Sequence, residues 1–342
     1  MKSLGLGRYA LSSCVAVAML TGCGGSQPPI GAPLAMPQSR AVATHVDRSG
    51  SWMSPGANSG DLLYVSDAGS KVVNVYSYPR GTKVGQLTGF ESPQGLCVDR
   101  AGDVFVTNSV ASGSSNILEF AHGGKTPIRT LSNPGMAPSG CAVNLTTGDL
   151  AVTNYCPLYQ GGCGSGNGDL IIYRKGSEPP KRHSRFSVRD FSFCGYDSAG
   201  NLYADGYDRR ASFTLVELPK GAKNLVRIRI HFSSSNGILY PGAVQWDGKL
   251  LAIGEQQVEF FNASVYRVDP ASGNIVAILP LHGSFDVPQF FIDGKVLIAP
   301  DSRAGKSGLV LFYNYPSGSK IRKTIGGLSM PFGAVVSPGT RR

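Results

Sequence analysis

The stretch that decides the fold reads Pro93-Gln-Gly-Leu-Cys-Val-Asp99, continues through Arg-Ala-Gly102, and ends in Asp103-Val-Phe-Val106. Two short apolar runs flank a tight turn that carries Asp and Gly, which is the pattern of a β-hairpin. The same pair of runs recurs along the chain. The second run of each pair begins at Leu63, Val104, Leu150, Leu202, Leu250 and Val296. These starts stand 41 to 52 residues apart, and a four-stranded propeller blade takes about 40 to 50 residues.

Two further runs follow each pair, so that every repeat supplies four strands. In the fourth repeat these are Leu215–Leu218, which precedes a Pro-Lys-Gly turn, and the more polar Leu225–Phe232. The 45 Gly and 22 Pro residues of the chain agree with many short strands joined by turns. The sequence therefore predicts an all-β fold, a six-bladed β-propeller of four-stranded antiparallel blades over residues 60–339.

The two ends of the repeat region complement each other. No first-type run precedes Leu63, but one appears at the C-terminus as Pro331-Phe-Gly-Ala-Val-Val-Ser337. We expect this last strand to complete the first blade and to close the ring. A ring closed by shared strands leaves few free sheet edges.

The first 22 residues have the features of an export signal. Lys2 and Arg8 accompany a mostly apolar run of 12 residues, Tyr9–Leu20, which is shorter than the roughly 20 residues that span a bilayer and fits a signal peptide. The run ends in Leu20-Thr-Gly-Cys23, which resembles a bacterial lipobox. The resemblance implies cleavage of residues 1–22 and lipidation of Cys23. Residue 24 is Gly, whereas Asp there commonly retains Gram-negative lipoproteins at the inner membrane, so we expect the outer membrane or the cell surface.

Residues 23–59 form the predicted lipidated linker. They are rich in Gly, Pro, Ser and Ala, which is typical of a flexible tether, and Ala41–Val46 could pair as a stray edge strand. The formal net charge of the chain is +10, with scattered Lys and Arg. A basic surface can attract nucleic acid or anionic polymers, but an exported protein rarely meets nucleic acid. We expect a solvated basic surface on a monomer with no nucleic-acid partner.

The repeat resembles those of the NHL-repeat propellers and the related gluconolactonase-like propellers. Their repeat reads roughly Pro-x-Gly-aliphatic-x-Val-Asp, a turn with Gly, then Leu-Tyr-Val-x-Asp. The copies here are degenerate, and the one around Phe193–Asp197 lacks the Pro and Gly at the corresponding positions. The resemblance implies the propeller fold. Fold alone implies no single activity, because propellers host many.

Five cysteines lie in the repeat region. Cys156 and Cys163 stand seven apart in a Gly-rich excursion, and exported proteins can keep disulfides. We predict a Cys156–Cys163 bridge rather than a zinc site, because no other Cys or His pair flanks it. Cys97, Cys141 and Cys194 lie in the first runs of three successive repeats. Buried free thiols and a Cys141–Cys194 bridge are both open alternatives for them.

Polar residues recur near the ends of the second runs. In such propellers these ends share one face with the ligand site over the central channel. The residues are Asp67, Asn108, Asn154, Asp205, Glu255 and Asp301. A ring of oxygen ligands can hold Ca²⁺ or another divalent cation, and the alternative is that these side chains bond to their own loops. His231 and His282 precede first runs near the same face, but surface positions are the simpler interpretation of both.

No nucleophile elbow, His-Glu-x-x-His helix or phosphate-binding loop occurs in the chain. We therefore expect a membrane-anchored binding or interaction platform outside the cytoplasm, and catalysis is not the favoured interpretation. Its partner would be an envelope protein, a glycan or a small molecule. The alternative is a metal-dependent hydrolase or lactonase of the gluconolactonase-like type, which would require a divalent ion.

Overall fold

The computed structural model describes residues 50–159, 162–185, 187–233, 237–257, 262–302, 307–318 and 320–339. The predicted signal peptide, the predicted lipidation site Cys23 and the segment Ala41–Val46 lie outside these residues. The chain divides into Met1–Asp47 and Arg48–Arg342, and the description below concerns the second unit. Of the described residues, none lies in a helix that is long and apolar enough to cross a membrane.

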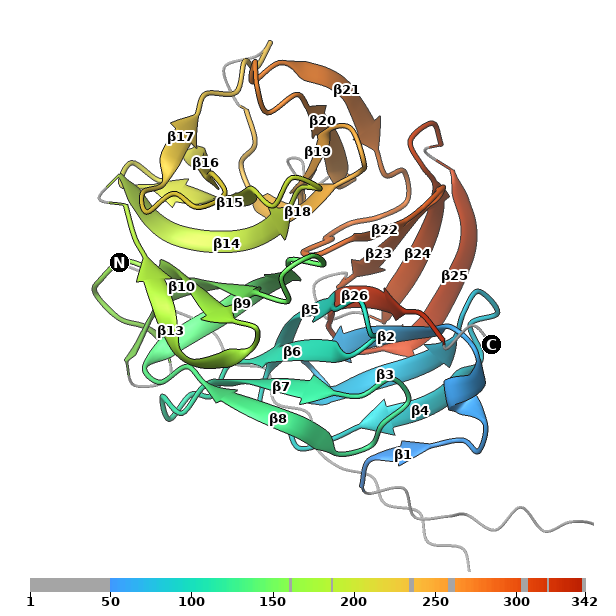
Figure 1. Cartoon of the computed structure of the whole chain (residues 1–342). Helices are drawn as coiled ribbons and strands as arrows, with labels where there is room; N and C mark the ends of the chain where they lie inside the picture. Colours follow the sequence, from blue (N-terminus) through green and yellow to red (C-terminus); the bar gives the residue numbers. More distant parts are fainter. Residues whose placement is uncertain are drawn as a thin grey trace, which may run out of the picture. The chain divides into compact units, whose positions relative to one another are not determined.

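Six antiparallel sheets make up the described unit, and each supplies one blade of a six-bladed β-propeller (Figure 1). Blade 1 contains β26 (Pro331–Ser337), β2 (Leu62–Asp67), β3 (Val72–Ser77) and β4 (Lys83–Leu87). Blade 2 contains β5 (Pro93–Val98), β6 (Val104–Asn108), β7 (Asn116–Phe120) and β8 (Pro127–Ser132). Blade 3 contains β9 (Met136–Val143), β10 (Leu150–Tyr159), β12 (Asp169–Arg174) and β13 (Ser177–His183).

The other three blades follow in chain order. Blade 4 contains β14 (Val188–Tyr196), β15 (Leu202–Asp208), β16 (Phe213–Leu218) and β17 (Val226–Ile228). Blade 5 contains β18 (Pro241–Trp246), β19 (Leu251–Glu255), β20 (Ser264–Val268) and β21 (Ile275–Pro280). Blade 6 contains β22 (Phe291–Asp293), β23 (Val296–Asp301), β24 (Gly308–Asn314) and β25 (Ile321–Leu328). The predicted all-β, six-bladed fold is confirmed.

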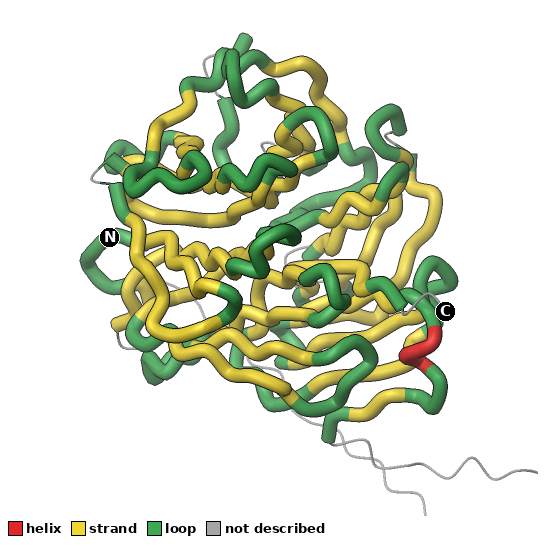
Figure 2. Tube along the Cα trace, viewed as in Figure 1, coloured by secondary structure: helices red, strands yellow, loops and turns green. Residues whose placement is uncertain are grey.

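The first strand of every blade lies at the axis of the ring. β5 contacts β9 and β26, β14 contacts β9 and β18, and β22 contacts β18 and β26, so the six first strands form a closed circle. Strands dominate the described unit, and the short 3₁₀ helix η1 (Ala57–Ser59) is drawn in red in Figure 2.

The core consists of six apolar clusters, one between each pair of neighbouring blades. Side chains alternate between the two faces of a strand. Each blade packs against a neighbouring blade on both of its faces, so the side chains on both faces are covered. Tyr64 of β2 packs toward blade 2, whereas Leu63 and Val65 pack toward blade 6. All six residues of β2 are consequently buried, which explains the continuous apolar runs in the sequence.

Close packing of the first strands near the axis explains the Gly of the Pro-x-Gly motif. A Cβ atom on Gly95 would lie 2.9 Å from Gly140 Cα in the next blade, and one on Gly140 would lie 2.9 Å from the Phe193 ring. Contacts this short do not occur with real Cβ atoms, so the first strands approach each other closely only where a side chain is missing.

The C-terminal strand closes the ring, as predicted. β26 pairs antiparallel with β2, so that Leu63 lies opposite Val336 and Val65 opposite Ala334. Figure 1 shows the red β26 beside the blue β2. Two side-chain bonds strengthen the seam, because Ser66 Oγ accepts the Gly333 N–H at 2.9 Å and Asp67 accepts the Met330 N–H at 2.7 Å.

The N-terminal boundary differs from the prediction. The linker was expected to extend to Ser59, but β1 (Trp52–Met53) pairs with the outer strand β4 of blade 1. These two apolar residues stand within a Gly- and Ser-rich segment and extend the sheet. The folded unit therefore begins before residue 60.

Two disulfides are present among the described residues. The predicted Cys156–Cys163 bridge is confirmed, and it joins β10 to the short β11 (Gly162–Cys163). The second bridge joins Cys97 to Cys141, between the innermost strands of blades 2 and 3.

The suggested Cys141–Cys194 bridge and the free-thiol alternative for Cys97 and Cys141 are wrong. Cys141 and Cys194 occupy equivalent positions and both face the preceding blade, where their sulfurs lie near Phe105 O and Ala151 O, respectively. Cys97 stands one position later in its strand and faces the following blade, so it meets Cys141. Cys194 is buried and has no disulfide partner among the described residues.

We predict that deletion of residues 330–342 prevents stable folding. The deletion removes β26, exposes Leu63 and Val65 of the blade 6 interface, and leaves β2 with an open edge. Thermal melting followed by circular dichroism would measure the effect, and deletion of residues 340–342 alone serves as the control. An unchanged melting temperature in the longer deletion would refute ring closure.

The Cys97–Cys141 bridge should contribute more stability than the Cys156–Cys163 bridge. The two bridges span 44 and 7 residues, and loop-closure entropy then corresponds to about 4 and about 2 kcal/mol, respectively. Urea unfolding of the Cys97→Ala/Cys141→Ala and Cys156→Ala/Cys163→Ala double variants would compare them. An equal or larger loss in the second variant would contradict this prediction.

Candidate functional site

The ring has two different ends. One end carries the turns between first and second strands, such as Asp99–Gly102, and we call it the turn face. At the other end the second strands finish and the first strands begin, and we call it the mouth face. The six predicted polar residues all lie in the second strands toward the mouth face. All six are buried: Asp67, Asn108, Asn154, Asp205, Glu255 and Asp301.

Four of these residues hold the loop that enters their own blade. Asn108 Oδ1 accepts the N–H groups of Glu91 and Ser92 at 3.0 and 3.1 Å. Asp301 likewise accepts those of Phe285 and Asp286. Asp67 accepts those of Ser329 and Met330, and Glu255 accepts that of Leu239. These bonds satisfy backbone donors at strand entrances, which is a structural role.

Asn154 and Asp205 differ from the other four. Asn154 donates to Asp169 Oδ1 at 2.6 Å and exchanges bonds with the Asn133 amide. Asp205 stands one position earlier in its strand, where blades 2 and 3 have Thr107 and Thr153. Its Oδ1 accepts the Phe193 N–H at 2.9 Å, and its Oδ2 is buried without a hydrogen-bond partner among the described residues. Burial raises the pKa of Asp205 well above its usual value.

Among the described residues, the four carboxylates of the predicted cation ring form no group of three with ligand atoms within 4.8 Å of one another. Within the described residues, the only three His, Cys, Asp or Glu side chains with ligand atoms within 4.8 Å of one another are Asp99, Asp103 and Glu119, on the turn face. A cation site built from the six mouth-face residues stays a prediction. His231 and His282 are both exposed, and the His282 ring contacts Asn262 at 3.4 Å.

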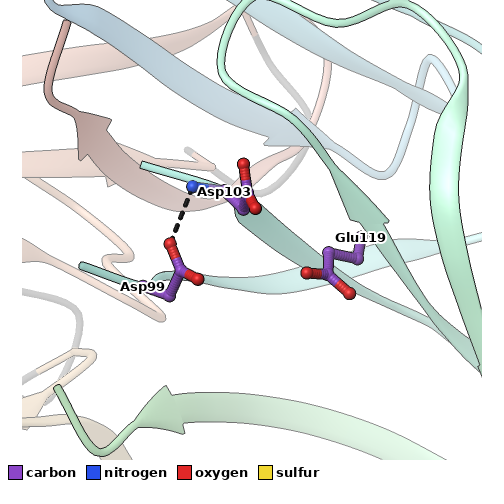
Figure 3. A group of neighbouring side chains, drawn as sticks. All are labelled: Asp99, Asp103 and Glu119. Atoms are coloured by element: carbon purple, nitrogen blue, oxygen red, sulfur yellow. Dashed lines mark hydrogen bonds between the residues drawn. The ribbon is translucent and has the colours of Figure 1, made fainter. Parts of the chain in front are cut away.

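The acidic cluster of Asp99, Asp103 and Glu119 lies in blade 2, where the two aspartates flank the hairpin turn and Glu119 stands on the third strand (Figure 3). The dashed bond in Figure 3 joins the Asp103 N–H to Asp99 Oδ1 at 2.9 Å. Glu119 on β7 pairs with Arg129 Nε at 3.0 Å. Burial raises the pKa of Asp103 and of Glu119. Carboxylate oxygens suit Ca²⁺, but Arg129 already supplies a positive charge to this group.

The same turn chemistry occurs in other blades, which favours a structural role for the acidic cluster. In blade 4, Asp197 Oδ1 accepts the Asn201 N–H at 2.8 Å. In blade 5, Asp247 pairs with Arg267 at 2.8 Å, and Arg267 stands at the position that corresponds to Glu119. The repeat therefore places an Asp at this turn, where its side chain accepts hydrogen bonds from backbone N–H groups. The residue at the neighbouring position of the third strand differs between blades.

Aromatic and hydroxyl side chains gather at the mouth face. A pit of about 430 Å³ opens there into the central channel. Tyr155 follows Asn154 in β10, Tyr207 lies two residues after Asp205 in β15, and Tyr240 precedes Pro241 at the start of β18. We call this pit the tyrosine mouth. Serine and glutamine side chains complete its wall: Ser92, Ser109, Ser139, Ser192, Gln94 and Gln256.

Two phenylalanines form the inner end of the tyrosine mouth. The rings of Phe193 and Phe332 stack with centroids 5.9 Å apart, and both residues line the pit. Phe193 also lines a second cavity of about 360 Å³ on the turn-face side of the axis, which is mostly apolar and includes the Cys97–Cys141 bridge. Gln289 exchanges two hydrogen bonds with the Leu96 backbone along this cavity, at 2.9 and 2.7 Å.

The charges around the tyrosine mouth are balanced. No charged side chain lines the pit in the part of the chain that the structure describes. Arg189 lies 5.9 Å from the centroid of the Tyr207 ring, and it pairs with Asp190 at 2.6 Å. Burial raises the pKa of Tyr155 and of Tyr207, so both phenols stay protonated at neutral pH. The Tyr207 hydroxyl donates to Leu239 O at 2.9 Å, which fixes its ring.

These tyrosines were not predicted as site residues from the sequence. They stand beside the predicted polar residues, because second-strand ends and first-strand starts meet at the mouth. The available signal was a Tyr directly after Asn154 and a Tyr directly before Pro241. Without a structure, no motif distinguishes these positions from the rest of the 14 Tyr in the chain.

No protein-family model and no curated protein sequence matches the chain. Solved structures are similar in fold. A chain of the nidogen/laminin complex has a TM-score of 0.62 and 14% identity over 82% of this chain and 100% of that chain. TolB from Acinetobacter baumannii has a TM-score of 0.60 and 17% identity over 83% and 68%, respectively. A protein of unknown function from Bacteroides caccae has a TM-score of 0.59 and 12% identity over 82% and 99%.

These similarities establish the β-propeller fold. They do not indicate an activity, because the sequence identity is 17% or lower in all three. The resemblance to NHL-repeat and gluconolactonase-like propellers stays a prediction.

The Asp205→Asn variant should be more stable than the native protein near pH 7. The unfolded chain ionises Asp205 near the usual value of 3.8, whereas burial keeps the folded carboxyl protonated to higher pH. The unfolded state therefore releases this proton first, and ionisation favours unfolding as pH rises above about 4. Urea unfolding at several pH values should show that the free energy of unfolding of the variant exceeds that of the native protein, and that this difference shrinks toward pH 4. A gain independent of pH would contradict the raised pKa.

Proposed function

We propose that this chain is a lipid-anchored binding platform of the bacterial cell envelope and that it binds its partner at the tyrosine mouth. The observation that carries the proposal is the pit itself, in which three tyrosines from blades 3, 4 and 5 surround the end of the channel. Tyrosines are enriched at binding sites because they offer a rigid apolar face and one polar group. Concave sites at ring axes are favourable places for ligands.

Rigidity supports this function. The mouth is made from several blades, so its geometry depends on the closed ring and on the Cys97–Cys141 bridge. A preorganised surface loses little conformational freedom on binding. The similar fold in the nidogen/laminin complex agrees with a role in association.

The anchor part of the proposal rests on the N-terminal sequence. Leu20-Thr-Gly-Cys23 follows a charged and apolar leader. A lipidated N-terminus with more than one acyl chain would hold the protein on a membrane, since each buried methylene contributes about 0.8 kcal/mol. Residues 24–49 would then connect the anchor to the propeller.

No specific observation favours the metal-dependent hydrolase alternative. The close carboxylate group among the described residues lies on the turn face and contains Arg129 as a counter-charge. The mouth-face carboxylates Asp67, Glu255 and Asp301 accept bonds from loop backbone.

The test uses full-length protein with a C-terminal tag, expressed in its native bacterium and cross-linked in intact cells. The native protein should be recovered from membranes with a specific envelope component. Tyr240 is half exposed, so Tyr240→Ala should fold, remain in membranes and recover about tenfold less of that component. Cys23→Ser should leave the membrane fraction.

Tyr159→Ala is the matched control, because Tyr159 is an exposed tyrosine at the end of β10 outside the tyrosine mouth. It should recover the component as the native protein does. Absence of any specific component, or equal recovery by Tyr240→Ala, would contradict the platform. Retention of Cys23→Ser in the membrane would contradict the anchor.

A further inference from the structure

The wall of the tyrosine mouth is both aromatic and rich in uncharged hydrogen-bonding groups. Tyr155, Tyr207 and Tyr240 contribute ring faces, and the serine and glutamine side chains contribute hydroxyl and amide groups. Each of these polar groups can donate or accept a hydrogen bond. Such a wall suits a ligand that combines C–H surfaces with many hydroxyl groups.

The electrostatics of the mouth favour an uncharged ligand. The formal charge of the chain is +10, yet no Lys or Arg among the described residues lines this pit. The Arg189 guanidinium near the Tyr207 ring is neutralised by Asp190 at 2.6 Å. Within the described wall, an anion would therefore find no unpaired positive charge, and a bound cation would find no carboxylate.

The shape of the mouth favours the end of a chain over its middle. The rings of Phe193 and Phe332 stack across the channel with centroids 5.9 Å apart, and Phe193 stands between this pit and the second cavity because it lines both. The pit volume of about 430 Å³ lies at the low end of small-molecule sites, which range from about 300 to 1,000 Å³. A site of this size accepts one terminal unit, and the charged terminus of a peptide would find no counter-charge in the described wall.

We infer that the tyrosine mouth binds one uncharged sugar unit, the terminal residue of a neutral glycan. This inference rests on the proposed binding function and names its ligand class. Tyr155 and Tyr240 pack against the C–H faces of the sugar ring, because aromatic rings bury apolar surface at a low entropic cost. Ser92, Ser139 and Gln256 exchange hydrogen bonds with its hydroxyl groups.

The hydrogen bonds already present within the wall orient its side chains and leave hydroxyl and amide groups that a ligand can contact. Tyr207 is committed to Leu239 O and keeps its ring in place. Gln256 donates through Nε2 to Pro241 O, which orients its amide at the rim. Gln94 donates to Ser92 Oγ at 2.7 Å, so that the hydroxyl proton of Ser92 can point toward an acceptor on the sugar.

The experiment measures binding of free sugars to the soluble part of the chain that follows Cys23, after thermal melting has shown that it folds. Isothermal titration uses a panel of neutral hexoses, 6-deoxyhexoses and N-acetylhexosamines. Glucuronate, glucosamine and choline are the charged probes. At least one neutral sugar should bind saturably, and the charged probes should bind at least about tenfold more weakly, a difference of about 1.4 kcal/mol.

Variants assign the binding to the mouth. Tyr155→Ala and Tyr240→Ala should each weaken the sugar about tenfold or more, and Tyr159→Ala should leave its affinity unchanged. Gln256→Ala should weaken the sugar while melting at the native temperature. No binding by any neutral sugar, preferential binding of choline or glucuronate, or equal loss in Tyr159→Ala would overturn the inference.

The two proposals fail in distinguishable ways. If no sugar binds but Tyr240→Ala still loses its cross-linked envelope component, the mouth binds something other than a neutral glycan and the platform stands. If a sugar binds and Tyr240→Ala recovers the envelope component as the native protein does, the sugar site exists but does not carry the proposed interaction.

Discussion

Pairing between β26 and β2 is the interaction on which the rest of the structure depends. Leu63 and Val336 lie opposite each other although the chain between them contains all the other blades. Without this pairing, the blade 6–blade 1 cluster would lose Ala334 and Val336 and would open to water. Because each blade buries its faces only against its two neighbours, loss of one seam weakens the whole ring.

The closed ring makes the tyrosine mouth possible. Its side chains come from several blades that are far apart in the sequence, so only a fixed angle between blades brings them together. The Cys97–Cys141 bridge joins two of those blades near the axis. Asn108 and Asp301 accept hydrogen bonds from the loops that lead into the first strands of their blades, and these bonds fix the positions of the loops. The polar residues thus stabilise the mouth, and the aromatic residues form its surface.

The repeat allowed the fold to be predicted, because few folds are compatible with a hairpin pattern that recurs at a regular spacing. The same pattern located the closing strand, and the short spacing of Cys156 and Cys163 predicted their bridge. Pairing of Cys97 with Cys141 was missed because it depends on which neighbour a side chain faces, and a shift of one residue reverses that direction. Asp205 stands one position earlier in its strand than the other five predicted polar residues, an offset that the degenerate repeat does not show. The tyrosines were missed because contacts between blades leave no local spacing in the sequence.

Native-state amide hydrogen exchange, resolved by peptide, tests the closed ring most directly. If the ring opens only when the whole propeller unfolds, the amides of β26 and β2 should exchange as slowly as those of β5 and β6 in blade 2. Fast exchange confined to β26, with the other innermost strands still protected, would mean that the seam opens independently and would contradict the account.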